Sequence, residues 1–248
     1  PLVKINSRGA TGLMVAFGTG RNITEGDRTD SSVQTIYSVL DNTLYKTKKL
    51  TSPKDKNIVE ISNKVTPEAL GSGTSNLIEQ TVGSKKISGS GVSAGLNFWE
   101  VSQNKVEFTG TGAKKGWYMH FPETGERLLQ SASFYDGSNI LEVISTVPGS
   151  GGSIEEESCA PSPKDPRKYR TFLNIMDGKK ASVQIIDVNG DGIYNSDDTP
   201  VSRMDAPLVE SKTFDKDFEI RTSGDGKQQV KLGKMPESPL RPSWRQLQ

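Results

Sequence analysis

Apolar residues along this chain occur in short runs, most of which alternate with polar residues and end at Gly, Asn, Asp or Ser. Helical spacing is scarce, so the pattern is typical of β-strands that bury one face. Residues 33–40 alternate and stop at Asp41-Asn42, which predicts a strand and a turn. In residues 117–121, His120 alternates with Tyr118, as an exposed strand position does. Residues 12–17 form a near-continuous apolar run, which predicts a strand buried on both faces.

Three pairs of such segments flank turn-forming residues and therefore predict hairpins. The first joins residues 129–134 to 140–145 and the second joins 170–175 to 181–186; the third joins 218–222 to 228–232. Strands at this spacing indicate an all-β protein built as a sandwich, a barrel or a propeller.

Two ranges interrupt this pattern. Residues 52–93 mix polar residues with Gly/Ser clusters, and we expect a surface insertion there, with a short helix around residues 67–70. Residues 149–167 are acidic and then proline-rich, which predicts a flexible loop. With 248 residues in total, we expect a single domain over residues 1–248.

The charge and apolar composition argue against two classes of function, nucleic-acid binding and membrane association. The 31 Lys and Arg residues nearly balance 30 Asp and Glu residues, so the net charge of +1 provides no electrostatic footprint for nucleic acid or an anionic membrane. No apolar stretch approaches the ~20 residues of a membrane span. The chain begins at Pro1 without Met or a signal peptide, and we expect a mature fragment, with any export signal lying upstream.

The chain has one cysteine, Cys159, and one histidine, His120. Together they cannot form a Cys/His zinc site, and they lack the supporting residues of a Cys-His dyad nearby in sequence. Cys159 lies in a Ser/Glu/Pro-rich segment, where it is either a free thiol or bonded to a cysteine outside this chain.

Residues 187–198 read DVNGDGIYNSDD, which is the spacing of an EF-hand-type calcium loop. Ca²⁺ takes six to eight oxygens, so a short loop must turn back and direct alternate side chains inward. Gly192 permits that turn, and Ile193 offers its backbone carbonyl. The candidate ligands are Asp187, Asn189, Asp191, Ile193, Asn195 and Asp198.

The context of the loop separates it from a helix-loop-helix sensor. The β-branched segment 181–186 precedes it and predicts a strand, while Pro200 follows it and disfavours an immediate helix. We therefore expect a calcium loop on a β scaffold. Asp198 is one methylene shorter than the glutamate usual at position twelve, so the adjacent Asp197 remains a candidate for the same place.

Motifs outside the loop resemble the PilC/PilY family of type IV pilus-associated proteins of Gram-negative bacteria. Residues 15–21 (VAFGTGR), followed by Asp27, Asp30 and residues 34–41, are similar to the family's "FGTG(R/K)…GD…D…Q..Y…D" block. Residues 116–127 resemble its "GWY.dlP..GER" segment, and residues 243–247 resemble its terminal "SWR". These motifs occur in order over nearly the whole chain.

The resemblance implies the C-terminal portion of a modified β-propeller, with antiparallel blades and a calcium loop. Some family members close the calcium shell at the ninth loop position, where this chain has Asn195, so Asn195 and Asp198 are both candidates for the closing ligand. It also implies an extracellular protein, at the pilus tip or the bacterial outer-membrane surface, that favours pilus extension over retraction and mediates attachment to surfaces or host cells. The expected partners are the N-terminal part of the same full-length protein, the minor pilins of the tip and a host-cell receptor. A partial propeller exposes an apolar face unless further blades cover it.

Two alternatives have some basis in the residues. A dockerin also uses a D-V-N-G-D-G loop, but it carries two such loops, each followed by a helix. The only other Asp/Gly candidate, residues 223–226, reads as a hairpin turn. A propeller enzyme such as a glycosidase needs paired carboxylates. Nothing in the sequence pairs two of the available ones, Glu100, Glu107, Glu123 and Glu126, and we expect no enzyme.

Overall fold

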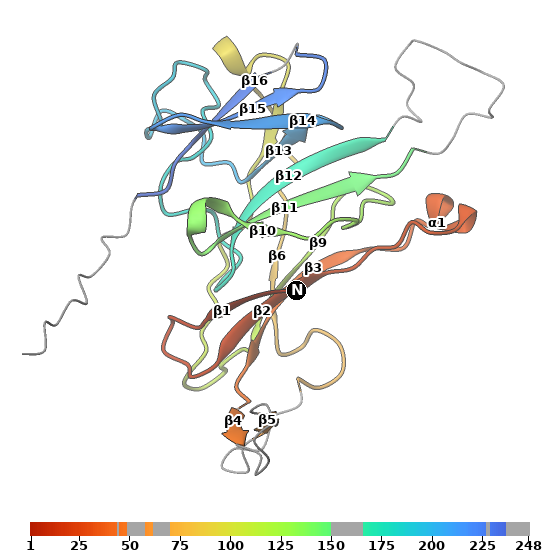
Figure 1. Ribbon diagram of the computed structural model, residues 1–248, viewed down its shortest axis with the longest axis vertical. Helices are drawn as coiled ribbons and strands as arrows, with labels where there is room; N and C mark the ends of the chain where they lie inside the picture. The colour runs from red at the N-terminus through yellow and green to blue at the C-terminus, as the bar shows by residue number, and fades with distance from the viewer. Residues whose placement is uncertain (44, 49–57, 62–69, 150–165, 227–228, 237–248) are drawn as a thin grey trace, which may run out of the picture.

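The computed structural model describes residues 1–43, 45–48, 58–61, 70–149, 166–226 and 229–236 (Figure 1). These residues form β-sheets with almost entirely antiparallel pairing, which confirms the predicted all-β class. Three sheets lie one above another in Figure 1, in separate layers. In the described part of the chain they do not close into a ring, and no helix is long and apolar enough to cross a membrane.

The first sheet has five strands. Their order across the sheet is β1 (Leu2–Ile5), β2 (Leu13–Gly18), β3 (Thr35–Asp41), β9 (Gly116–His120) and β6 (Ile78–Gln80). Only β6 runs parallel to its neighbour. The strand predicted at residues 12–17 is present as β2, but its predicted burial on both faces is wrong. Met14 and Ala16 are buried, whereas Phe17 on the opposite face is 41% exposed.

The second sheet has six strands and forms the middle layer. Their order is β10 (Ser133–Phe134), β11 (Ile140–Val147), β12 (Arg167–Asn174), β13 (Arg203–Ala206), β8 (Asn97–Trp99) and β7 (Ile87–Ser88). Alternate residues of β11 and β12 enter two different hydrophobic cores, with Leu141 and Leu173 on one side and Ile140 and Phe172 on the other. This sheet is therefore the one buried on both faces.

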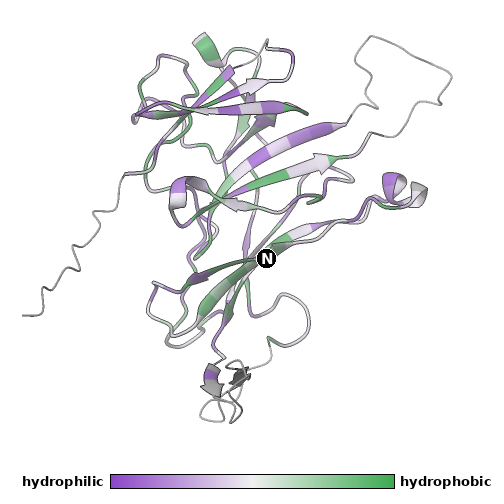
Figure 2. Ribbon diagram, in the orientation of Figure 1, coloured by the Kyte–Doolittle hydropathy of each residue, from purple (hydrophilic) through white to green (hydrophobic). Residues whose placement is uncertain are grey.

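The remaining elements are smaller. The third sheet contains β14 (Glu210–Phe214), β15 (Phe218–Ser223) and β16 (Gln229–Gly233), and a separate hairpin joins β4 (Tyr45–Lys48) to β5 (Ile58–Ile61). The helical turns are α1 (Glu25–Thr29), η1 (Gly91–Ser93) and η2 (Tyr135–Gly137). Apolar residues concentrate in strands such as β2 and β11, whereas β14 is mostly hydrophilic (Figure 2).

Two of the three predicted hairpins are confirmed. β10 pairs with β11 around the turn at η2, and β15 pairs with β16. The hairpin of residues 170–175 with 181–186 is wrong. β12 pairs instead with β11 and β13, and the second segment forms a single bridge, between Ile186 and Leu232. Its apolar residues Ala181, Ile185 and Ile186 are buried in the second core, so burial rather than strand pairing accounts for its composition.

The range predicted as a surface insertion, 52–93, is partly described. Its later residues contribute β6 and β7 to the two main sheets, and Gln80 is fully buried, so this portion belongs to the fold. The helix expected around residues 67–70 lies outside the described residues apart from Leu70, and the loop at 149–167 lies outside them apart from its ends. Cys159 also lies outside them.

Each interface between layers contains a buried charge cluster beside its hydrophobic core. Between the first and second sheets, Arg203 binds both carboxylate oxygens of Glu126, at 2.7 and 2.9 Å, and lies 3.9 Å from the ring of Tyr169. Between the second and third sheets, Arg221 on β15 donates to both oxygens of Glu142 on β11, at 2.9 and 3.0 Å. These pairs connect layers that strand pairing does not.

Candidate metal centre

The predicted calcium loop lies where the second and third sheets meet. Just before it, Ile186 bridges to Leu232, and the amide of Gly233 donates to the carbonyl of Ile185 at 2.9 Å. These contacts anchor the start of the loop on β16. After the loop the chain enters β13 rather than a helix. The loop is therefore attached to strands β16 and β13, but the strand predicted for the segment before it is wrong, because that segment forms only a single bridge.

The first half of the loop is a series of nested turns. The carboxylate of Asp187 accepts the amides of Gly190 at 2.6 Å and Gly192 at 2.9 Å. Asn189 accepts the amide of Asp191 at 3.0 Å, and Asp191 accepts that of Ile193 at 2.7 Å. Side chains at alternate positions therefore bend the backbone around themselves. Such turns give the tight backbone curvature that an ion-binding loop requires.

Gly192 has the conformation expected of the sixth loop position. Its φ is +82°, a left-handed value that side chains other than Gly rarely adopt. An added Cβ at Gly192 would meet nothing within 4 Å, so the requirement for glycine is one of backbone geometry rather than space.

Asp198 turns back over the beginning of the loop. Its Oδ1 accepts the amides of Val188 at 2.8 Å and Asn189 at 3.3 Å, and only 3% of its surface is exposed. Asp197 is exposed, and its amide donates to the Asn195 side chain at 2.6 Å. Of the two adjacent aspartates, Asp198 is therefore the buried one that folds back on the start of the loop.

The donors of the loop suit a hard cation. All are oxygens, and two of the carboxylates, Asp187 and Asp198, are buried at opposite ends of the loop. Within the described residues, no three His, Cys, Asp or Glu side chains are gathered closely enough to hold a metal ion by themselves. Binding would therefore also need the Asn oxygens and the Ile193 carbonyl, which matches Ca²⁺ better than Zn²⁺.

Tyr194, at the eighth loop position, faces the third sheet. Its ring lies 5.5 Å from that of Phe218, and its hydroxyl is buried without a hydrogen-bond partner among the described residues. Burial, together with the nearby carboxylates of Asp187 and Asp198, raises the pKa of Tyr194 well above its usual range. The ring links the loop to β15.

The residues that carry the family resemblance meet in a second cluster, on the first sheet. The buried guanidinium of Arg127 donates to the carbonyls of Gly125, Arg21, Asp27 and Asp30. In the sequence, these residues are recognisable only as positions of the family motifs. Their roles could not be predicted because the contacts of Arg127 with Arg21 and Asp27 span 106 and 100 residues.

Two of the four glutamates considered for catalysis pair with arginine side chains. Glu126 is held by Arg203, and Glu123 lies 3.3 Å from Arg167. His120 is exposed, as predicted, and its Nδ1 lies 2.7 Å from the hydroxyl of Thr35.

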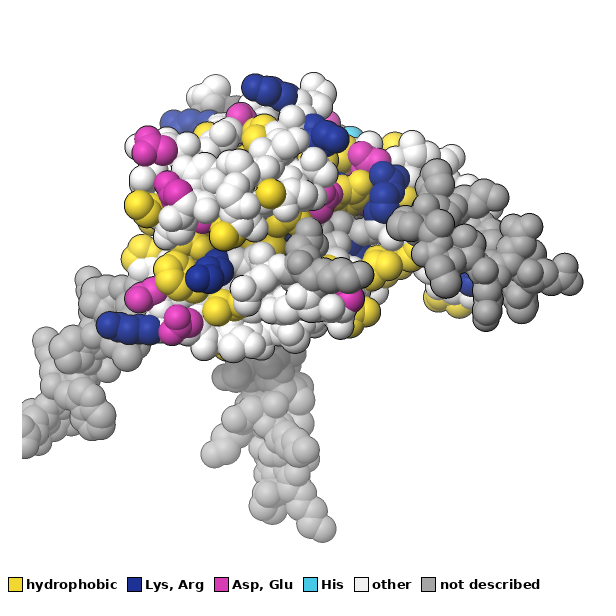
Figure 3. Space-filling model, turned by 90° about the horizontal axis from the view of Figure 1, so that it is seen from above, with side chains coloured by type: hydrophobic (Ala, Val, Ile, Leu, Met, Phe, Trp, Pro, Cys, Tyr) yellow, Lys and Arg dark blue, Asp and Glu magenta, His cyan; other side chains and the backbone are white. Residues whose placement is uncertain are grey.

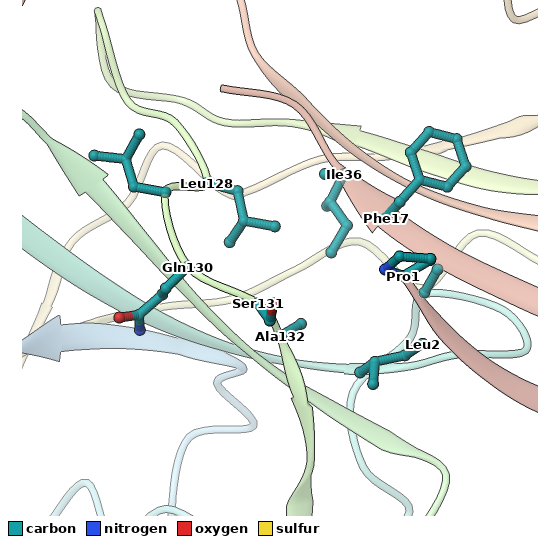
Figure 4. A pocket seen from close by; sticks show the side chains of 11 residues that line it. Pro1, Leu2, Phe17, Ile36, Leu128, Gln130, Ser131 and Ala132 are labelled. Carbon is teal, nitrogen blue, oxygen red and sulfur yellow. The ribbon is translucent and has the colours of Figure 1, made fainter. Parts of the chain in front are cut away.

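A cavity of about 320 Å³ opens beside β2, at the N-terminal end of the chain (Figure 4). Leu2, Phe17, Ile36 and Leu128 line it, and its wall contains no acidic, basic or histidine side chain. Viewed from above, the surface intersperses Lys and Arg with Asp and Glu (Figure 3). That face offers no large region of one charge to an anionic polymer.

The fold defines a class: an all-β protein of stacked, almost entirely antiparallel sheets. Among solved structures, the C-terminal domain of PilY1 from Pseudomonas aeruginosa has this fold, with a TM-score of 0.63 and 18% sequence identity. The likeness covers 95% of this chain and 44% of that one, so the chain spans less than half the length of the domain it matches. The resemblance to the PilC/PilY family is thereby confirmed at the level of the fold. The sequence matches no known family profile and no curated protein.

Proposed function

We propose that this chain is part of a calcium-binding, type IV pilus-associated protein without enzymatic activity. It acts as a pilus biogenesis factor and tip-associated adhesin that favours extension over retraction and mediates attachment to surfaces or host cells. Its place is outside the cell, at the pilus tip or outer-membrane surface. One conjunction carries the proposal: a PilY1-like fold with a loop in which Asp198 folds back over residues 188–189.

The stacked sheets support a propeller arrangement. Blades of a propeller pack face to face, and two such interfaces are present, each with its own core. The outer face of the first sheet has no covering layer in the described chain and exposes Val3, Ile5 and Phe17. We assign this face to the N-terminal part of the same full-length protein, while minor pilins and a host receptor are partners of the assembled molecule.

The loop gives calcium a physical role. Asp187, Asp191 and Asp198 belong to one twelve-residue turn, and their charges repel one another when no cation is bound. A bound Ca²⁺ would neutralise them and order the surface that the loop presents. Extracellular calcium modules bind at about 10⁻⁴–10⁻³ M, within reach of host fluids.

The dockerin alternative has less support. Its second loop would have to be residues 223–226, which form the turn between β15 and β16, with the amide of Gly226 donating to the carbonyl of Ser223 at 2.8 Å. The loop at 187–198 is followed by β13 and not by the helix that a dockerin requires.

The test compares two exposed aspartates of the same loop, Asp191→Ala and Asp197→Ala. Asp191→Ala removes a ligand and should weaken Ca²⁺ binding, measured by calorimetry, roughly tenfold or more. Asp197→Ala should bind within about twofold of wild type. In a strain expressing the full-length protein, only Asp191→Ala should reduce surface piliation in the presence of the retraction motor. Wild-type Ca²⁺ binding and piliation in Asp191→Ala would refute the proposal.

A further inference from the structure

The calcium loop is held from outside by a segment that carries no motif. Residues 90–93, at the tip of the connection between β7 and β8, lie against its first four residues. The hydroxyl of Ser93 donates to the carbonyl of Asp187 at 2.6 Å, and that of Ser90 donates to the carbonyl of Asn189 at 2.8 Å. The amide of Ser90 donates to the carbonyl of Val188 at 3.1 Å. Three successive loop carbonyls are therefore fixed by one segment.

The two backbones meet at glycines. Gly91 has a φ of +54°, and a Cβ there would lie 2.6 Å from the carbonyl oxygen of Gly190. A Cβ on Gly190 would lie 2.2 Å from the carbonyl oxygen of Ser90. A side chain at either glycine would therefore push the facing backbone segment away. The fit therefore depends on both glycines.

The contact reaches the loop from its outer side. The segment holds the carbonyls of residues 187–189, whereas the side chain of Asp187 bends inward to the amides of Gly190 and Gly192. Ser93 is buried, so its bond to Asp187 is shielded from water. The connection itself is anchored in the second sheet, where Ser88 pairs with Asn97 and the amide of Gly89 donates to the carbonyl of Leu96.

We propose that residues 90–93 preorganise the loop for its cation, with Ser93 and Gly91 as positioning residues that touch no ion. The inference rests on calcium being the ligand of the loop. A loop already held in its bound shape loses less conformational entropy on binding, so the segment should raise affinity without contributing a ligand. It also ties the state of the loop to the edge of the second sheet.

The experiment compares Ser93→Ala with Ser38→Ala. Ser38 is a matched control because it is also buried and its hydroxyl also donates to a carbonyl at 2.6 Å, that of Ile175 in the first core. Both variants should lower the melting temperature. Only Ser93→Ala should weaken Ca²⁺ binding, roughly three- to tenfold, as expected for one buried hydrogen bond. Gly91→Ala should weaken it further.

A second measurement needs no metal. In the chelated protein, Ser93→Ala should speed amide hydrogen exchange at Gly190 and Gly192, and Ser38→Ala should not. Equal Ca²⁺ affinity and equal exchange in the two variants would overturn the positioning role while leaving the calcium site intact. Absence of Ca²⁺ uptake by the wild-type chain would instead overturn the proposed function, and this inference with it.

Discussion

Asp27 shows how a single motif residue organises its surroundings. Its Oδ2 accepts the amides of Thr24 and Ile23, both at 2.8 Å, and its Oδ1 accepts the Nε of Arg21 at 2.8 Å. The hydrogen bonds from Thr24 and Ile23, assisted by Arg21, hold the pKa of Asp27 well below its usual range. The carboxylate is therefore a structural acceptor that fixes the start of α1.

This shift predicts a pH dependence of stability. The pKa of Asp27 is lower in the folded chain than the ~3.9 of an unfolded chain. Its contribution is therefore present above about pH 4 and is lost as the pH falls toward the folded-state pKa. We expect Asp27→Asn to melt below wild type at pH 7, and the gap to narrow at pH 3. Circular dichroism melts at several pH values measure it; a gap that stays constant with pH would contradict it.

At the scale of elements, the sequence predicts hairpins from their turn residues, but it does not predict which strands pair across the sheet. The hairpin of β15 and β16 could be predicted because its turn residues lie within the segment itself. Residues 181–186 have the composition of a strand, but β13 already occupies the free edge of β12, so they pack into the second core.

In the candidate site too, the local contacts could be predicted from the sequence and the long-range contacts could not. The turns of Asp187, Asn189 and Asp191 join residues two to five apart, and the regular spacing of the loop encodes them. Ser93 lies 94 residues from the Asp187 carbonyl that it binds, in a range that the sequence assigned to an insertion. Only the pairing of β7 with β8 brings it there.

The buried pair of Glu126 and Arg203 should contribute strongly to the docking of the first two sheets. Both residues are about 1% exposed, and Ser145 donates a further hydrogen bond to Glu126. Glu126→Gln leaves the Arg203 charge uncompensated and should lower the unfolding free energy by about 3–5 kcal/mol. Urea denaturation measures the change.

The double variant Glu126→Gln with Arg203→Met provides the control. Removing both charges should recover most of the loss, because an apolar side chain replaces a desolvated cation. If the double variant is as unstable as the sum of the single changes, the two residues are not coupled and the pair does not dock the sheets.

At the scale of the whole molecule, the layers leave one sheet face without a counterpart in the described chain. Register places Val3, Val15 and Phe17 on the side of the first sheet opposite to its core. Phe17 stacks on Tyr37 at 5.4 Å, and Tyr37 stacks on Tyr118 at 6.3 Å, so aromatic rings continue across three strands. An exposed apolar face of this kind marks an interaction surface.

This face predicts that the chain self-associates when it is produced without further sheets. A Val3→Lys, Ile5→Lys variant places charge on the edge strand β1 and should weaken self-association at least about fivefold in sedimentation experiments. Ile23→Lys is the matched control, because Ile23 is 85% exposed but lies beside α1, away from the sheet. Equal effects from the two variants would show that general surface charge, rather than the open face, controls association.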